Sequence, residues 1–405
     1  MDEKVAPVSK IVLPAAFVEF LHQNGLDPSI YIASQSIPRY IRLKPGCGTR
    51  VTEIEEEVKC KIRELSWLPN FYFLPPDVHI ASTKGYQEGK IYGIDAASGA
   101  SVIALNVSPG DHILDLCAAP GAKLCMILDL IGCSGSVTGV DVARHRLAAS
   151  RTMLQKYGQV TDVVFSLQME LFSPLFHQGF SQAVSCVMNL IKHRLVGMEE
   201  ESEIYKEWTH RRPYKERKRV AKARENVSRH PFVRNQDPEL IFYGRNSGVV
   251  GLRKSEVFRS VDDLEILQFG YDKVFVDAEC THDGSVRHIQ KFEQWGWETL
   301  SRRVLDAERT DDVTVLQLKL LTNGFRLLKA GGFLVYSTCS LTVAQNEDVV
   351  EQFLSQNLSA ELVEIEDAKG WPCSPARTPK TLRFDPSASF TSGLFIAKFT
   401  KLTIR

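Results

Sequence analysis

Two short stretches, Val276-Asp277-Ala278-Glu279-Cys280 and Tyr336-Ser337-Thr338-Cys339-Ser340, decide how this chain is expected to fold. Each contains or follows an apolar run typical of a β-strand, over residues 273–276 and 332–336. Open α/β sheets bind their ligands just beyond the carboxyl ends of their parallel strands. We therefore expect both cysteines at the ligand-binding edge of such a sheet.

A third strand end opens into a turn that contains glycine. The run Ile113-Leu114-Asp115-Leu116 continues as Cys117-Ala118-Ala119-Pro120-Gly121-Ala122-Lys123. A glycine turn lets the backbone approach a ligand and directs the N-terminus of the next helix towards it. Such a turn facing two strand-end thiols predicts a nucleotide-like cofactor beside a cysteine nucleophile.

Three charged residues are candidates for binding that cofactor. Asp115 is placed to meet a cationic amino acid group. Asp141, which ends the strand Gly139-Val140-Asp141, is placed to accept hydrogen bonds from a ribose, although it would also suit an N-cap of the next helix. Lys123 stands in the first turn of a helix, where a cation is unfavourable, and this predicts a ligand-facing side chain. By themselves these features would also fit NAD.

Strands and helices alternate from about residue 89 onwards. The expected strands are 113–116, 137–140, 163–165, 273–276, 333–336, 360–363 and 394–399, and the expected helices are 123–131, 144–157, 313–328 and 347–355. This alternation predicts an α/β fold with a doubly wound, seven-stranded sheet over residues 86–405. Residues 1–85 predict a small α+β domain with helices at 15–23 and 53–65 and a strand at 40–43.

An insertion at about 185–262 interrupts the alternation. Within it, Arg211 to Arg224 contains eight basic residues and one acid. Such a run suits a solvated loop, contact with an RNA backbone, or a nuclear import signal.

Composition narrows the class of protein. The chain has 405 residues, 44% of them hydrophobic and 24% charged, and its formal net charge is zero. Its nine cysteines contain no Cys-x-x-Cys pair, which argues against a disulfide framework or a zinc site and for a reducing compartment. The sequence shows neither an apolar run long enough to span a bilayer nor an N-terminal targeting pattern. We expect a protein of the nucleus or cytoplasm without a metal or a membrane contact.

Taken together, these segments resemble the Nol/Nop/Sun family of RNA cytosine-5 methyltransferases. The matching pieces, in order along the chain, are 95–98, 115–123, 139–141 with 144–147, 277–280, 331–340 with 346–347, and 393–398. The resemblance implies a Rossmann-like methyltransferase sheet, S-adenosylmethionine as cofactor, and tRNA or rRNA as substrate, with or without a protein partner. It also implies a small N-terminal domain of RNA-binding type.

The resemblance assigns roles to individual residues. Cys339 would be the nucleophile that adds to carbon 6 of cytosine, and Cys280 would assist release of the product. Asp277 would hold the edge of the base, with Lys123 nearby. The residues expected to bind the cofactor are Asp115, Cys117, Ala118, Ala119, Pro120, Gly121, Ala122, Lys123, Asp141, Arg146 and Asp277.

The chain departs from the family pattern in three places. Glu279 stands where the family usually has proline, and Thr281-His282-Asp283-Gly284-Ser285 replaces a small glycine turn. We expect His282 and Asp283 in an exposed loop, with a role as proton acceptor as the alternative. The acid expected after the third strand is not evident; Gln168 and Glu170 are the nearest candidates. These departures keep open a non-catalytic RNA-binding protein on the same fold.

Overall fold

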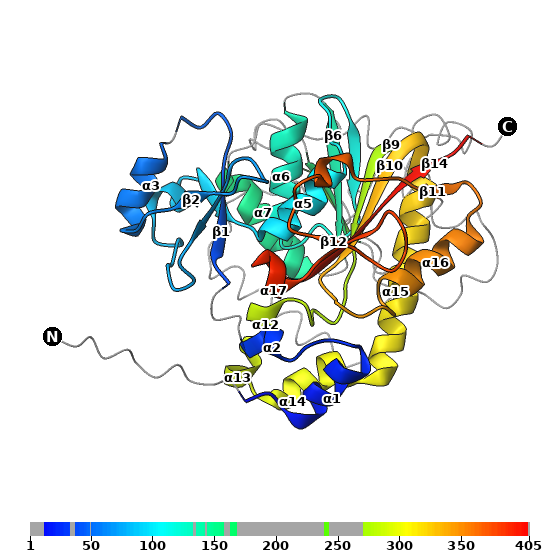
Figure 1. Cartoon of the computed structure of the whole chain (residues 1–405). Helices are drawn as coiled ribbons and strands as arrows, with labels where there is room; N and C mark the ends of the chain where they lie inside the picture. Colours follow the sequence, from blue (N-terminus) through cyan, green and yellow to red (C-terminus); the bar gives the residue numbers. More distant parts are fainter. Residues whose placement is uncertain are drawn as a thin grey trace, which may run out of the picture.

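The computed structural model describes residues 12–32, 37–48, 50–132, 135–141, 144–157, 163–167, 239–242 and 270–403. A ten-stranded sheet forms its centre, in the order β12-β13-β14-β10-β9-β5-β6-β7-β8, with β11 also paired to β14 (Figure 1). The parallel strands are β5 (His112–Asp115), β6 (Ser136–Asp141), β7 (Val163–Leu167), β9 (Tyr271–Asp277) and β10 (Leu328–Thr338). The others are β8 (Glu239–Phe242), β11 (Ala360–Leu362), β12 (Ser374–Pro375), β13 (Leu382–Phe384) and β14 (Leu394–Lys401).

All seven strands expected from the sequence lie in this sheet. Strand β14 is antiparallel to β10, and β11 and β13 pair in succession along the other edge of β14. The predicted doubly wound α/β fold is therefore confirmed, and β8, β12 and β13 add to the seven predicted strands.

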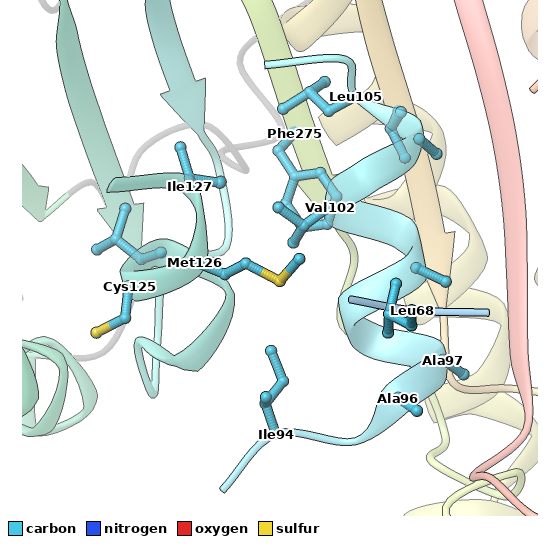
Figure 2. Packing of buried hydrophobic residues seen from close by; sticks show 14 of the residues in the cluster. Leu68, Ile94, Ala96, Ala97, Val102, Leu105, Cys125, Met126, Ile127 and Phe275 are labelled. Carbon is cyan, nitrogen blue, oxygen red and sulfur yellow. The ribbon is translucent and has the colours of Figure 1, made fainter. Parts of the chain in front are cut away.

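Helices cover both faces of the sheet, because its buried strands are apolar on both sides. In β9, Phe275 faces one hydrophobic cluster, while Val274 and Val276 face the other. The first cluster contains residues of α5 (Ala96–Ala104), α6 (Ala122–Ile131) and α7 (Arg144–Tyr157), and the second those of α15 (Ala307–Leu327) and α16 (Glu347–Gln356). Figure 2 shows Val102 of α5 beside Phe275, with Met126 of α6 extending towards α5.

A second, antiparallel sheet has the order β2-β3-β1-β4. Its strands are β1 (Arg39–Leu43), β2 (Arg63–Glu64), β3 (Phe71–Leu74) and β4 (Ile91–Gly93), and it carries α3 (Val51–Val58). The helix expected over 53–65 was too long. Lys59 adopts a left-handed conformation at φ 56°, which ends α3, and Arg63 and Glu64 pair with β3 instead.

The small sheet docks on α5 and α6 of the large one. Arg42 forms a buried ion pair with Asp129 of α6, and the Tyr92 hydroxyl donates to the same carboxylate at 2.9 Å. A Cβ built on Gly99 of α5 would lie 2.3 Å from the Phe71 ring, so only glycine permits this approach. The small sheet and the helices of the large sheet therefore share a close-packed boundary.

The first helices do not belong to this small sheet. The helices α1 (Ala15–Gln23) and α2 (Ser29–Ile32) pack on α12 (Val286–Gln290), α13 (Phe292–Trp295), α14 (Trp297–Leu300) and the π-helix η4 (Ser301–Leu305) (Figure 1). Phe17 and Tyr31 are buried there against Phe292 and Val304. The packing thus divides the N-terminal part differently from the single unit expected over 1–85, and β4 extends the small sheet to Gly93.

The remaining short helices are α4 (Lys84–Gln87), η5 (Glu366–Ala368) and α17 (Pro386–Ser389). Of the expected insertion at 185–262, the structure describes only β8; the basic run Arg211 to Arg224, Gln168 and Glu170 lie outside the described residues. Among the described residues, no helix combines the length and apolar character that a membrane crossing requires.

Candidate active site

The site lies where the strand order reverses, beside the carboxyl ends of β5, β9 and β10. From β5 the chain continues through β6 and β7 on one side, and β9 and β10 lie on the other. In register, Asp115 pairs with Phe275 and Asp277 with Ser337, so the three strands end at nearly the same level. Such a switch point opens a crevice for ligands in α/β sheets. The strand-end positions quoted from the sequence therefore converge.

Two thiols meet at this edge. Cys280 follows β9 and Cys339 follows β10, and their Sγ atoms lie 3.3 Å apart. Cys280 is buried, with 1% of its surface exposed, and Cys339 is partly exposed. The backbone N–H of Ala278 donates to the carbonyl of Ser337 at 2.9 Å, which continues the pairing of the two strands up to the thiols. The two free cysteines thus lie next to each other at this edge of the sheet, where the sequence predicted them.

His282 joins the two thiols. Its Nδ1 atom lies 2.8 Å from Cys339 Sγ and 3.6 Å from Cys280 Sγ. The expectation of an exposed loop here is wrong for His282, because a left-handed backbone at φ 58° turns its ring into the site. All three ligand atoms lie within 4.8 Å of one another, a set that would also suit a soft metal ion. The expectation that this protein holds no metal stays a prediction.

The three groups titrate together. Burial opposes ionisation of Cys280, but the hydrogen bond with Cys339 and the charge of His282 bring the pKa of the Cys280 thiol well below its ordinary value. The hydrogen bond with Cys280, reinforced by burial, raises the pKa of Cys339. The negative charge of Cys280 raises the pKa of His282 to about 9 against the effect of burial. His282 Nδ1 lies closer to Cys339 Sγ than to Cys280 Sγ, and the imidazole can take a proton from either thiol.

Asp283 is buried, contrary to the expectation of an exposed loop. Its Oδ2 atom accepts a hydrogen bond from the backbone N–H of Leu341 at 2.7 Å, and its Oδ1 atom accepts one from the Thr281 hydroxyl. Its carbonyl accepts from the Tyr31 hydroxyl at 2.8 Å. Burial raises the pKa of the Asp283 carboxyl. This residue ties the loop after Cys280 to the loop after Cys339 and to α2.

Buried amides hold the same two loops. Gln345 accepts from the backbone N–H of Thr281 at 3.0 Å and donates to the Thr281 hydroxyl at 2.9 Å. Asn346 donates to the carbonyls of Ser340 and Thr342 at 2.9 and 2.8 Å. Both side chains are fully buried, where an unpaired amide would be costly. The sequence reading did not anticipate the role of Gln345, although Asn346 formed part of the resemblance.

Asp277 and Lys123 form an ion pair between the end of β9 and the first turn of α6. Lys123 Nζ lies 2.6 Å from Asp277 Oδ1, and the Ser337 hydroxyl donates to the same oxygen at 2.8 Å. Lys123 comes from the first turn of α6 and Asp277 from the end of β9. The unfavourable position of Lys123 at a helix N-terminus is thus offset by a carboxylate partner. The structure brings together both residues that the sequence assigned to the site.

The glycine turn is held from both sides. The Cys117 backbone N–H donates to Asp115 at 3.1 Å, and that of Ala119 donates to Asp141 at 3.3 Å. Arg146 donates to the Ala119 carbonyl at 3.0 Å and lies 3.6 Å from Asp141.

The conformation of this turn depends on Gly121 at its end. Gly121 has a φ of 107°, and a Cβ there would lie 2.9 Å from the backbone of Ser150 in α7. Hydrogen bonds therefore join the turn over residues 117–123 to Asp115, Asp141 and Arg146. The alternative of Asp141 as an N-cap of α7 stays open, because residues 142 and 143 lie outside the described residues; its carboxylate accepts from the Ala119 N–H.

Burial sets the charge of Asp115. Only 1% of its surface is exposed, and burial raises the pKa of the Asp115 carboxyl to about 7, with a further contribution from the charge of Asp277. Burial likewise raises the pKa of Cys117. A buried carboxyl near neutrality is poised to ionise when a cationic group binds beside it.

Glu279 forms an ion pair with an arginine of α15. Its carboxylate lies 3.4 Å from Arg309 of α15, and both side chains are about one third exposed. Gln317 donates to the Glu279 carbonyl at 2.7 Å. The extra acid in the first cysteine motif is thus neutralised by an arginine. In the helices that follow this loop, Trp295 is half exposed and Trp297 packs at the edge of the cluster formed with α1.

Comparisons with known proteins agree with this geometry. The sequence model of the family described as 16S rRNA methyltransferase RsmB/F matches residues 102–178 and 251–400, more than half of the chain. A mitochondrial tRNA (cytosine(34)-C(5))-methyltransferase of Danio rerio is 26% identical over 303 residues, which cover 74% of this chain and 56% of the relative. The 5-cytosine rRNA methyltransferase NSUN4 of Bos taurus is 27% identical over 279 residues, 68% of this chain and 48% of the relative. The chain spans about half the length of these curated relatives.

Solved structures show the same fold. A methyltransferase homolog protein from Pyrococcus horikoshii aligns with a TM-score of 0.56 and 20% identity over 96% of this chain and 100% of its own. NSun6 from the same organism, solved with SFG, aligns with a TM-score of 0.60 and 16% identity over 96% of this chain and 99% of its own.

Proposed function

This chain belongs to the RsmB/F family of RNA cytosine-5 methyltransferases, and we propose that it methylates carbon 5 of a cytosine in RNA through a covalent bond to Cys339. One observation carries the proposal. The thiols of Cys339 and Cys280 lie 3.3 Å apart at the strand ends that border the glycine turn. This short separation supports the proposal that a nucleophile and a second thiol act on one target base.

The chemistry requires a strong nucleophile because carbon 5 of cytosine is itself unreactive. The Cys339 thiolate forms a bond to carbon 6, which makes carbon 5 an enamine carbon able to attack an electrophilic methyl group. A base then removes the carbon 5 proton, the carbon 6–sulfur bond breaks, and Cys339 is released as a thiolate. A cysteine suits this step because its thiolate is intrinsically very nucleophilic. Cys280, at 3.3 Å, is placed to act in the release step.

Asp277 and Lys123 orient the base in this proposal. A carboxylate beside the ring favours protonation of the ring nitrogen, and this draws electron density from carbon 6. The ion pair with Lys123 and the bond from Ser337 hold the Asp277 carboxylate in one position before the base arrives. Fixed polar groups of this kind stabilise developing charge without reorganising during the reaction.

The residues of the crevice fit S-adenosylmethionine, which supplies the electrophilic methyl group when bound. Asp115 offers a carboxylate to the amino group, and Asp141 lies at the end of β6, where an acid commonly binds a ribose in such folds. Arg146 fixes the turn by its bond to Ala119. This role for Asp115, Asp141, Arg146 and the turn 117–123 is part of the proposal.

The substrate is a cytosine in tRNA or rRNA. Some of the relatives are named as tRNA methyltransferases and others as rRNA methyltransferases. They share a cytosine in structured RNA as their target, and this does not favour tRNA over rRNA. A base in a duplex must be extruded before the thiol can reach it, at a cost of a few kcal/mol. An unpaired loop or a terminus is therefore the favoured target. We propose that the small sheet over 39–93 binds the RNA and that the basic run 211–224 also contacts it. The proposed location of the protein is the nucleus or the cytoplasm.

Methyl transfer to RNA tests the function directly. Labelled S-adenosylmethionine would be incubated with total cellular RNA, separated by size, and the wild type compared with Cys339→Ala. Label in one RNA class with the wild type alone supports the proposal. If both proteins bind the cofactor and neither labels any RNA, the non-catalytic RNA-binding reading replaces it.

A further inference from the structure

The loop after Cys280 carries an imidazole that lies outside the motifs used so far. His282 Nδ1 is 2.8 Å from Cys339 Sγ, shorter than its 3.6 Å distance to Cys280 Sγ. Building on the function proposed above, we infer that His282 is a catalytic residue of this chain. It accepts the thiol proton of Cys339 as that sulfur adds to the cytosine ring.

The backbone is arranged to present this ring. A residue other than glycine at φ 58° is strained by about 1–2 kcal/mol, so the surrounding contacts must hold it there. The Ser285 backbone N–H donates to the His282 carbonyl at 3.0 Å, and Asp283 is anchored to the Leu341 N–H. Neighbouring bonds on both sides of His282 therefore fix the direction of its side chain.

A second ring limits the imidazole on its other side. The rings of His282 and His288 meet edge to face with centroids 5.6 Å apart, and His288 in turn contacts Phe292 and Trp295. Aromatic pairs prefer this geometry, and packing of this kind restricts rotation of the ring. His282 is thus placed by its loop and by its neighbours against the sulfur atoms.

The charges around His282 favour its protonated form. The largest effect on its pKa comes from Cys280, and the carboxylates of Asp277 and Glu279 act in the same direction. Burial, together with the positive charges of His282, Lys291 and Arg303, lowers the pKa of the neighbouring His288 to about 4. His288 therefore stays neutral and leaves the proton on His282.

The proposed step is a proton transfer that needs no oxidant or reductant. The proton moves from Cys339 Sγ to His282 Nδ1, and the thiolate forms the sulfur–carbon 6 bond. Carbon 5 then takes the methyl group, and its proton leaves to a base. The carbon 5–carbon 6 double bond re-forms as the carbon 6–sulfur bond breaks, which returns the thiolate beside the same imidazolium. His282 gains and loses no net proton over the cycle.

The reactivity of Cys339 towards iodoacetamide tests the pair without RNA. The reaction would be followed by mass spectrometry from pH 5.5 to 9.5 in a Cys280→Ser background, with a chelator present to remove soft metals. We expect a rate that is already near its maximum at pH 7. Replacing His282 by glycine, which tolerates the left-handed backbone, should lower the rate at pH 7 about 10-fold and restore the titration of an ordinary cysteine near pH 8.5.

His288→Phe is the matched control, because it keeps an aromatic ring against His282 and removes only the second imidazole. It should retain the pH profile of the parent protein. A profile unchanged by His282→Gly would overturn the inference, and so would a profile that His288→Phe alters to the same extent.

Methyl transfer supplies the second readout. His282→Gly should lower kcat about 100-fold, as loss of a general base does, with an unchanged KM for S-adenosylmethionine. Added imidazole should restore part of kcat, because it can occupy the space left by the ring. A folded His282→Gly protein that imidazole does not rescue would assign His282 a structural role. RNA that stays unlabelled while alkylation still depends on His282 would refute the proposed function and leave the ion pair intact.

Discussion

The backbone N–H of Gly284 donates a hydrogen bond to the carbonyl of Cys339 at 2.9 Å, so the loop that carries one thiol is bonded directly to the residue that carries the other. The Gly284 carbonyl accepts in turn from the N–H of Gly393 at 2.8 Å, at the start of β14. Three segments far apart in sequence are thereby held at the site. The separation of the two sulfurs is consequently a property of the backbone as well as of the side chains.

Gly284→Ala should separate these loops. A Cβ at this position would lie 2.6 Å from the Cys339 carbonyl oxygen and 3.2 Å from the Gly393 Cα, and both are backbone atoms that cannot move alone. We expect a loss of about 1–3 kcal/mol in the free energy of unfolding, the usual cost of overpacking. Urea unfolding measures it. Gly331→Ala is a poor control because of its positive φ, whereas a surface change such as Leu358→Ala should have little effect.

Cys280→Ala and Cys339→Ala should fail at different points. Loss of the nucleophile should abolish both methyl transfer and any covalent complex with RNA. Loss of Cys280 should block release, so that a protein–RNA adduct stable to denaturant accumulates. Denaturing electrophoresis with labelled RNA separates these outcomes. Turnover by Cys339→Ala would refute the nucleophile assignment, and slow turnover by Cys280→Ala without an adduct would make Cys280 structural.

Cofactor affinity should rise with pH between about 5.5 and 7.5. The pKa of Asp115 is raised to about 7 by burial, so its carboxyl is neutral in the lower part of this range and ionises in the upper part. A cationic amino group binds better to the ionised form, and binding therefore strengthens as the proton leaves. Calorimetry with S-adenosylmethionine measures the effect. The Asp115→Asn variant should bind S-adenosylmethionine more weakly, and its affinity should not rise with pH. Any pH dependence that remains in this variant reports the titration of the ligand itself.

The same carboxyl should make stability depend on pH in the opposite sense. The folded pKa of Asp115 lies above its unfolded value, so the folded state binds the extra proton between about pH 4 and pH 7. Its contribution to the free energy of unfolding therefore falls as pH rises through that window and is fully lost above it. In denaturant titrations of the ligand-free protein, the free energy of unfolding of Asp115→Asn should increase relative to that of the wild type as pH increases from 5 to 8. An equal difference at both pH values would contradict the assignment.

Asp283→Ala should destabilise the site, whereas Asp283→Asn should do so less. The aspartate accepts from the Thr281 hydroxyl and the Leu341 N–H. Alanine removes the side-chain acceptor of the Leu341 N–H and leaves the Thr281 hydroxyl only the longer contact with Ser340 Oγ at 3.5 Å. Each lost partner costs about 1–3 kcal/mol, and asparagine can still satisfy one of them. Thermal unfolding gives the stability, and the rate of Cys339 alkylation reports the loop. Equal stability of the alanine variant and the wild type would show that Asp283 does not tie the loops.

Local patterns in the sequence were sufficient for the frame of this protein. Alternating strands and helices, a glycine turn after Asp115 and cysteines after two apolar runs predicted the seven strands and the convergence of Asp115, Asp277, Cys280 and Cys339. These features depend on periodicity and on the rule that parallel strands end at one edge, both of which can be read from neighbouring residues. The unfavourable position of Lys123 at a helix N-terminus predicted a side chain that faces a ligand, and its ion pair with Asp277 is supplied by the structure.

Contacts between distant segments were decided by the tertiary structure. His282 and Asp283 lie in a polar stretch that favours an exposed loop, yet Tyr31, 252 residues away from Asp283, and the residues after Cys339 bury that stretch. The first two helices pack on α12 to η4 because burial of their apolar faces is favourable against any apolar surface. The local sequence does not indicate which surface that is. The sequence by itself placed the two thiols at one edge of the sheet. Only the folded chain brought an imidazole to 2.8 Å from Cys339, since that distance depends on packing among residues that the sequence keeps far apart.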